Sequence, residues 1–303
     1  MSFQEQLKQK SAEISRDITG FLPPEAGFQK TILEACNYSV INGGKRLRPI
    51  MMEAAYLLCR YPKENGERKC SSEDNAVLLP FMAAMEMIHS SSLVHDDLPC
   101  MDNDVLRRGV PSTWAKFGED MGTLAGDGLM IYAFETACRS AAEPRALSDA
   151  ISILARKTGI FGMIGGQTVD VQLTGQRPSL EQLQFIYRLK TGALIEASFM
   201  IGAVLAGADA DTVRTLEEAA GCIGMAFQIQ DDILDVTATE GELGKPIGSD
   251  AANGKVTWLT YFGMEQSLKD VQEYTDRALE LVKSVGSYPF LEELLLSLVH
   301  RRS

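Results

Sequence analysis

The chain has 303 residues, of which 45% are hydrophobic and 23% charged, and this composition is typical of a globular protein with a buried core. An excess of 41 acidic over 29 basic residues gives a formal charge of −12, which argues against the basic face that nucleic-acid binding requires. The apolar runs fall short of the ~20 residues that span a bilayer, and the N-terminus lacks the apolar centre of a signal peptide. We therefore expect a cytoplasmic protein with no membrane span and no nucleic-acid partner.

The cysteines are scattered, and no two of them form a C-x-x-C pair. They are Cys36, Cys59, Cys70, Cys100, Cys138 and Cys222. Most lie within apolar runs, so we expect buried thiols in a reducing compartment and neither a disulfide framework nor a zinc site.

Helical periodicity dominates the chain. Apolar residues recur at three- and four-residue steps from Leu78 to Ile88 and from Leu183 to Ala193. Alternating apolar and polar runs are almost absent, so we expect no sheet. The breaks between helices, rich in glycine, proline and polar residues, are expected at residues 22–27, 61–72, 108–112, 174–178, 207–211 and 239–254. None of them looks like an interdomain linker, so the sequence predicts one all-α domain over residues 1–303.

The first segment that suggests chemistry is GGKRLRP at residues 43–49, which places three cations beside two glycines and a proline. A flexible backbone with guanidinium donors is a composition that suits phosphate binding. Further cations near glycines are Arg107, Arg108, Lys190, Lys245 and Lys255. Each alone is more often a solvated surface charge, but together, in an acidic protein, they indicate an anionic ligand.

The next segment, HDDLPCMDND at residues 95–104, holds four carboxylates after a strongly apolar stretch. Pro99 disfavours the helical conformation at Leu98, so the helix should end here and the aspartates should crowd its C-terminal end. That end is the negative pole of the helix dipole, so the placement favours a compensating cation. A solvated acidic loop is the alternative, and the segment alone leaves both open.

A second acidic cluster, QIQDDILD, lies at residues 228–235. Asp231 and Asp235 are one helical turn apart and share a face with Gln228. The flanking residues are too apolar for an exposed face, and carboxylates in such surroundings must be neutralised. The cluster therefore predicts a bound metal ion.

The residue types favour a hard metal ion. The chain has only three histidines, and neither cluster contains the Glu-x-x-His pair of a di-iron bundle. Mg²⁺ typically takes one or two carboxylates and completes its coordination with water and substrate phosphates. We therefore expect both clusters to face one cavity and to hold Mg²⁺ ions and a diphosphate between them.

Together these motifs resemble the trans-isoprenyl diphosphate synthases, specifically the bacterial farnesyl/geranylgeranyl type. The matching words run from GGKRLRP through His89, DDLPCMDNDVLRRG, LAGD, GGQTVD, KTGALI, FQIQDDILD and GKPIGSD to KVT at residues 255–257. The resemblance implies the isoprenoid synthase fold, an antiparallel helix bundle around a central cavity, and a homodimer. It also implies an enzyme that uses up to three Mg²⁺ ions to add isopentenyl diphosphate to an allylic diphosphate, giving farnesyl (C15) or geranylgeranyl (C20) diphosphate.

The resemblance assigns roles to individual residues. The metal ligands would be Asp96, Asp97, Asp102, Asp231, Asp232 and Asp235. The substrate-binding residues would be Gly44, Lys45, Arg48, His89, Arg107, Arg108, Lys245 and Lys255. Of these and Lys190, the allylic diphosphate would be contacted by Arg107, Lys190 and Lys245, and the isopentenyl diphosphate by Lys45, Arg48, His89 and Arg108. Lys190, Thr191 and Gln228 would line the allylic cation, and Gln167 and Asp170 would support them from behind. The loop at residues 239–255 would close over the substrates.

Three positions bear on finer properties. Trp114 stands where the family often has histidine, and its consequence is open. Ser91 and Ser92 lie one turn, ~5.4 Å, before Asp96, where a bulky aromatic commonly limits the family's products to fifteen carbons. Serine leaves a tunnel open there unless Met87, Ile88, Met121 or a partner subunit fills it. C15 and C20 therefore remain equal alternatives, and the preferred starter is also open.

Two other functions compete with this interpretation. A terpene cyclase shares the ionisation chemistry, but it would not need the second diphosphate site indicated by GGKRLRP and Arg108. A non-catalytic subunit of a heteromeric synthase typically loses aspartates from the clusters, and the expected metal ligands are all present in this chain.

Overall fold

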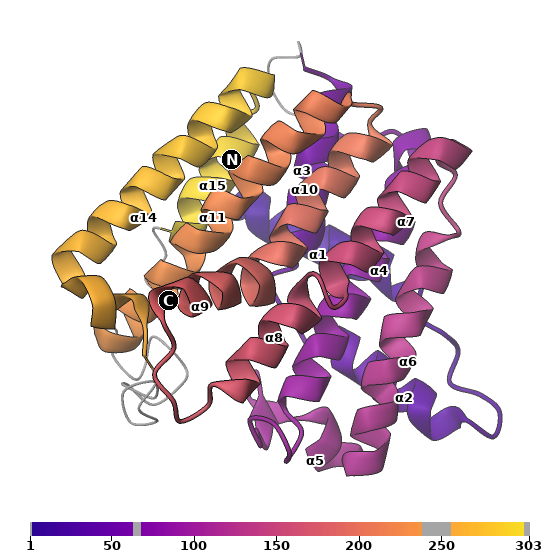
Figure 1. Ribbon diagram of the computed structural model, residues 1–303. Coiled ribbons are helices and arrows are strands. Elements are labelled where there is room, and N and C mark those ends of the chain that lie inside the picture. The colour runs from indigo at the N-terminus through magenta and orange to yellow at the C-terminus, as the bar shows by residue number, and fades with distance from the viewer. Residues whose placement is uncertain (1, 63–67, 238–255, 300–303) are drawn as a thin grey trace. The chain divides into compact units, whose positions relative to one another are not determined.

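A computed structural model describes residues 2–62, 68–237 and 256–299, and the chain divides into two compact units. Unit 1 comprises residues 1–53 and 69–151, and unit 2 comprises residues 54–68 and 152–303. Both units are built from α-helices (Figure 1), so the predicted all-α class is confirmed. Two helices, α3 (Leu47–Arg60) and α7 (Pro144–Thr158), contribute residues to both units.

Unit 1 is organised around one long apolar helix. Its other helices are α1 (Phe3–Thr19), α2 (Lys30–Ile41), α5 (Thr113–Phe117) and α6 (Glu119–Ala137). The long helix, α4 (Ser72–Asp96), begins at a capping box in which Ser71 and Asp74 satisfy each other's backbone amides. It ends at Asp96, as the proline at position 99 predicts, and the periodic residues from Leu78 to Ile88 are buried.

Helix α4 packs against α6 through small residues. A Cβ added at Gly126 would lie 2.1 Å from His95 Nε2, and one at Gly122 would lie 2.9 Å from Trp114 Cβ. These glycines therefore let α6 approach both the end of α4 and the segment that follows it.

The same helix is long and apolar enough to cross a membrane. It is the one such helix among the residues that the structure describes, and 72% of its most apolar window is buried inside the protein. A core helix of this kind passes a test of length and composition alone, so the finding is weak evidence for a membrane span.

A short hairpin corrects the expectation that no sheet is present. Strand β1 (Leu106–Arg107) pairs antiparallel with β2 (Val110–Pro111), and Arg108 and Gly109 form the turn with φ angles of +55° and +79°. Strands of two residues are too short to show an alternating pattern in the sequence. The hairpin matters because it presents Arg107 and Arg108.

Unit 2 is a set of helices packed on α11. They are α8 (Met163–Gln172), α9 (Leu180–Ile186), the π-helix η1 (Tyr187–Gly192), α10 (Ala193–Leu205), α11 (Ala210–Thr237), α14 (Trp258–Val285) and α15 (Pro289–Val299). Helix α14 is interrupted at Gly263, where φ is +70°. Helix α11 contacts α10, η1, α14 and α15, so its two ends and its faces are fixed by most of the unit.

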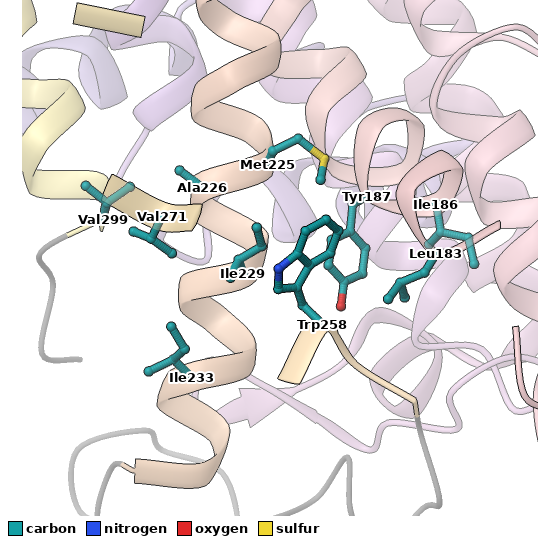
Figure 2. Close-up of a cluster of buried hydrophobic side chains, with 10 residues drawn as sticks. All are labelled: Leu183, Ile186, Tyr187, Met225, Ala226, Ile229, Ile233, Trp258, Val271 and Val299. Atoms are coloured by element: carbon teal, nitrogen blue, oxygen red, sulfur yellow. The ribbon is translucent and has the colours of Figure 1, made fainter. Parts of the chain in front are cut away.

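An apolar cluster joins five of these elements, α9, η1, α11, α14 and α15. Figure 2 shows Tyr187 of η1 and Trp258 of α14 close together, with Met225 and Ile229 of α11 beside them. The Tyr187 and Trp258 rings lie 6.3 Å apart between centroids at an interplanar angle of 32°. This cluster anchors the start of α14 against α11 and η1.

All six cysteines lie in the described part of the chain, and all are free thiols. Cys36 is buried, and burial raises its pKa to about 11. Cys100 and Cys138 are exposed, so the expectation of burial is wrong for these two.

Candidate active site

The first acidic cluster is a loop that folds back on the end of α4. The backbone amide of Asp102 donates to the Asp96 carbonyl at 2.9 Å, and that of Asp104 donates to the Asp97 carbonyl at 3.1 Å. These bonds satisfy carbonyls that a helix C-terminus otherwise leaves without partners. The fold-back brings the backbones of Asp96 and Asp102 close together, with Asp96 half-buried and Asp102 exposed.

Asp97 differs from its neighbours in this cluster. Only 2% of its surface is exposed, and its carboxylate forms a bidentate pair with Arg107, whose Nε lies 2.9 Å from Oδ1. Burial raises the pKa of Asp97, and the Arg107 guanidinium acts in the opposite direction. Arg107 also lies 3.3 Å from Asp104 Oδ2. Asp97 therefore holds the arginine that was predicted to bind the allylic diphosphate.

Trp114, the departure from the family pattern, has a specific place. Its indole Nε1 donates to the Asp104 carbonyl at 3.0 Å. The indole therefore fastens the end of the acidic loop, a role that requires only a donor.

The hairpin brings together the cations predicted to hold isopentenyl diphosphate. Arg108 Nη1 donates to the Gly43 carbonyl, and a Cβ added at Gly44 would lie 3.0 Å from the Arg108 guanidinium. On α3, Arg48 Nη1 lies 3.3 Å from His89 Nε2 of α4. The glycines at positions 43 and 44 both have positive φ angles, which glycine adopts without strain. Unit 1 thus gathers Gly44, Arg48, His89 and Arg108.

Burial and the nearby positive charges shift the pKa values of these groups. The pKa of His89 is lowered well below 6.5, first by burial and then by Arg48 and Arg108. The pKa of Arg48 is also lowered, chiefly by burial. Like charges that repel one another in the free protein favour an anion between them.

Arg46, the middle cation of GGKRLRP, does not join this group. It is 5% exposed and donates to Glu86 at 2.6 Å, to the Val40 carbonyl at 2.7 Å and to Ser15 at 3.1 Å. A buried pair of this kind belongs to the core of unit 1, so one of the three predicted phosphate-binding cations is structural.

In unit 2 two of the predicted catalytic residues, Lys190 and Thr191, lie on the π-helix η1. Lys190 Nζ donates to Asp170 Oδ2 of α8 at 2.6 Å, and Thr191 Oγ1 donates to Gln228 Oε1 of α11 at 2.9 Å. Single π-turns occur frequently at functional sites. The structure therefore brings Lys190, Thr191, Gln228 and Asp170 together, and their catalytic and supporting roles stay predictions.

Two glycines allow the flanking helices to approach η1. A Cβ added at Gly166 of α8 would lie 2.3 Å from the Lys190 backbone nitrogen. One added at Gly224 of α11 would lie 2.9 Å from Gly192 Cα. Sequence reasoning did not single out these glycines, although GGQTVD contains the first of them.

The second acidic cluster also contains one buried member. Asp231 and Asp235 are half-buried on α11, whereas Asp232 is 3% exposed. Asp232 Oδ2 accepts hydrogen bonds from the Tyr187 hydroxyl at 2.5 Å and from the Trp258 amide at 2.9 Å. Tyr187 and Trp258 were missed from the sequence, since nothing local links them to the cluster.

Several predictions are not tested by this geometry. Lys245, Lys255 and the rest of the loop at 239–255 lie outside the described residues. The two acidic clusters belong to different units, so their meeting across a central cavity stays a prediction, as does the single domain. Among the described residues, no group of three or more His, Cys, Asp or Glu side chains converges on a metal site. Lys45 is exposed, and Gln167 is half-buried on α8.

The serines predicted to set product length both bond to their own helix. Ser91 Oγ donates to the Ile88 carbonyl at 2.9 Å and Ser92 Oγ to the His89 carbonyl at 2.8 Å. Ser91 is fully buried, and so are Met87 and Ile88.

A pocket of unit 1 lies beside the Asp97–Arg107 pair. Its cavity volume is about 30 Å³, and Ser90, Leu93 and Val94 form its α4 wall. Arg107 and Arg108 border it from the hairpin. Sequence reasoning did not find this pocket, because its walls come from α2, α4 and the hairpin.

Comparisons with known proteins agree on one family. The family model described as Polyprenyl synthetase matches residues 29–286. The geranylgeranyl pyrophosphate synthase of Capsicum annuum chloroplasts is 41% identical over 84% of this chain and 67% of its own. The farnesyl diphosphate synthase of Geobacillus stearothermophilus is 39% identical over 88% of each chain. A geranyltransferase of Helicobacter pylori, solved with magnesium and isoprenyl diphosphate, aligns with a TM-score of 0.82 at 32% identity, over 99% of this chain and 97% of its own.

Proposed function

Because the chain belongs to the polyprenyl synthetase family, we propose that it joins an allylic diphosphate to isopentenyl diphosphate, head to tail and in trans, to make a longer prenyl diphosphate. The family model extends across both units, which supports one catalytic domain over residues 1–303. Relatives named for farnesyl and for geranylgeranyl products are almost equally similar, so identity does not choose between C15 and C20.

The observation that carries this proposal is the group formed by the cations Arg48 and Arg108 with His89 and Gly44. Arg48 and His89 are 3.3 Å apart, and Arg108 reaches the glycine turn from the hairpin. A group of this kind suits a second diphosphate, which a chain-lengthening enzyme binds and a cyclase does not. Lys45 is exposed beside this group and would close on the same ligand.

The carboxylates fit magnesium. They form an all-oxygen donor set, and Asp96, Asp102, Asp231 and Asp235 keep part of their surface exposed. These four would hold up to three Mg²⁺ ions, while the burial of Asp97 and Asp232 suits a supporting role. Bound Mg²⁺ supplies charge that stabilises a departing diphosphate. One solved neighbour is described as a complex with magnesium, which supports this choice of metal.

The chain's own residues perform the remaining tasks. Arg107 and Lys190 bind the allylic diphosphate and favour the charge that builds on it as the carbon–oxygen bond breaks. The oxygens of Thr191 and Gln228, fixed by their 2.9 Å bond, line the allylic cation. Asp170 holds Lys190 in place, and Gln167 lies on the same helix. The isopentenyl double bond then attacks the cation, and the released diphosphate takes the final proton.

Product length depends on the residues that close the bottom of the product tunnel, one helical turn before Asp96. Ser91 and Ser92 are small side chains one turn before the acidic cluster, and a larger side chain there would stop elongation sooner. We expect Ser91→Tyr to shift the product mixture toward fifteen carbons. An unchanged mixture would refute the role of this floor.

A homodimer in the cytoplasm completes the proposal. Leu124 and Ile131 of α6 are 48% and 72% exposed, which supports a contact with a second copy through this helix. A sizing column with light scattering tests this.

The purified protein, incubated with dimethylallyl or geranyl diphosphate, isopentenyl diphosphate and Mg²⁺, should release diphosphate and form a C15 or C20 alcohol after dephosphorylation. Arg48→Met should raise the KM for isopentenyl diphosphate and leave that for the allylic substrate unchanged, with Lys116→Met as a control. Diphosphate release without a longer product would identify a cyclase, and no turnover without a partner would identify a subunit.

A further inference from the structure

We propose that Asp232 is a positioning residue, which fixes η1 through Tyr187 and the start of α14 through Trp258, and that it is not a magnesium ligand. The inference deepens the proposed function, on which it rests, because η1 carries Lys190 and Thr191. It also corrects the expectation that every aspartate of the second cluster binds metal.

The hydrogen bonds of Asp232 already use one of its oxygens. Oδ2 accepts from the Tyr187 hydroxyl at 2.5 Å and from the Trp258 amide at 2.9 Å. A carboxylate oxygen offers about two lone-pair sites, so these two donors use the capacity of Oδ2. A metal ion at that oxygen would displace one of them.

The surroundings of Asp232 make that displacement costly. The residue is 3% exposed, and both of its donors belong to the apolar cluster of Figure 2. The Trp258 ring also packs on Phe262 at 4.8 Å, and its indole Nε1 donates to Asp270 at 2.6 Å. A buried donor that loses its partner in such surroundings is destabilised by its full desolvation cost. Mg²⁺, in contrast, needs hydrated access.

The direction of the side chain agrees with its burial. Adjacent residues of an α-helix point about 100° apart, so Asp232 faces a different direction from Asp231. Asp231 and Asp235 share one face and are both half-buried, whereas Asp232 points into the helix packing. Of the adjacent pair, Asp231 therefore faces the proposed ligand, and Asp232 supports the helix packing.

The bond to Tyr187 acts at the first residue of η1. Lys190 and Thr191 follow it by three and four residues and have their own bonds to Asp170 and Gln228. Three bonds therefore hold η1. Tyr187, at its start, is bonded to α11, Lys190 is bonded to α8, and Thr191 is bonded to α11. Loss of the first hold lets the turn shift, and small misplacements of catalytic groups lower rates strongly.

The test compares Asp232→Asn, Asp232→Ala, Tyr187→Phe and the Asp232→Ala/Tyr187→Phe double variant. An amide oxygen can still accept both bonds, so Asp232→Asn should keep kcat within about tenfold of wild type. Asp232→Ala should lose about 100-fold, and the double variant should be no worse, because the two side chains act through one contact. A metal ligand would instead lose its function in Asn and Ala alike, and additive losses would overturn the proposal.

The magnesium dependence provides a second readout. The Mg²⁺ concentration that gives half-maximal rate should stay within about twofold of wild type in Asp232→Asn and Tyr187→Phe. Asp231→Asn, the matched change on the neighbouring residue, should raise it about tenfold or more. A comparable rise in Asp232→Asn would overturn the proposal.

A third readout requires no substrate, so it separates failure of this inference from failure of the proposed function. In a Trp114→Phe background Trp258 is the only tryptophan, because the chain has two. Acrylamide should quench Trp258 more in Tyr187→Phe and Asp232→Ala than in the parent, since each change loosens the start of α14. Unchanged quenching would refute the anchor. If Asp232→Ala does not fold, the same measurements on Tyr187→Phe alone test the proposal.

Discussion

Asp97 and Asp232 occupy the same place in their clusters, the second of two adjacent aspartates, and both are buried, at 2% and 3% exposure. Asp97 is matched by the guanidinium of Arg107, whereas the two donors to Asp232, a hydroxyl and a backbone amide, are neutral. The partner of Asp97 is ten residues away, but those of Asp232 are 45 and 26 residues away.

The difference shows that the buried aspartates of two similar acidic motifs are stabilised by different interactions. The first cluster is a local loop whose buried charge is balanced by a cation that can also meet a diphosphate. The second is a joint between helices, in which the carboxylate serves as a hydrogen-bond acceptor. The first region therefore depends on charge, and the second on geometry.

The largest effect is expected at the first aspartate of each cluster. Asp96→Asn and Asp231→Asn should each lower kcat by about 100- to 1,000-fold, because each removes a carboxylate proposed to hold the Mg²⁺ charge that stabilises the departing diphosphate. Steady-state diphosphate release measures this. Asp211→Asn, on the exposed start of α11, is the matched control and should leave kcat unchanged. A loss confined to one cluster would break the parallel between them.

A stability comparison separates the two buried aspartates. Asp97→Asn leaves Arg107 without its counter-charge and should cost about 2 kcal/mol, less than the 3–5 of a fully buried pair because the Arg107 side chain is 26% exposed. Asp232→Asn keeps an acceptor for its neutral donors and should cost about 1 kcal/mol. Urea unfolding of both variants measures the difference, and the reverse order would contradict the contrast between charge and geometry.

The geometric character of the second region can be sharpened with glycines. Gly166→Ala and Gly224→Ala should each destabilise the protein by about 1–3 kcal/mol, because the added methyl meets backbone of η1. Gly128→Ala on α6, whose added Cβ would have its nearest neighbour at 3.6 Å, is the matched control and should be neutral or slightly stabilising. Thermal unfolding distinguishes them. Equal effects at all three sites would mean that η1 tolerates displacement.

The smallest effect concerns the cationic side of the first region. The pKa of His89 is lowered well below 6.5 by burial and by Arg48, so the folded protein keeps it neutral while the unfolded chain takes up a proton as the pH falls through 6.5. Acidification therefore favours unfolding at this residue, with no contribution above pH 7. Between pH 7.5 and 5.5, wild type should lose about 1 kcal/mol more than His89→Gln. Parallel stability curves for the two proteins would contradict the shift.

Much of the fold could be predicted from the sequence because its signals are local. The periodicity from Leu78 to Ile88 and the proline at position 99 fixed the core and the end of α4. The two-residue strands carry no such signal, so the hairpin that presents Arg107 and Arg108 was missed. Within the candidate site, the sequence identified which residue types gather, but it could not distinguish Arg46, buried against Glu86, from Arg48, placed beside His89.

By itself, then, the sequence determined the helical class and the end of α4, and it identified the residues that we propose bind diphosphate. Only the tertiary structure showed which aspartate of each cluster is buried and which glycines allow helices to pack closely against η1. It alone revealed the hydrogen bonds from Tyr187 and Trp258 to Asp232. The physical reason is the distance along the chain over which each interaction acts. Helix periodicity and caps act within a few residues, whereas burial and these hydrogen bonds depend on partners up to 45 residues away.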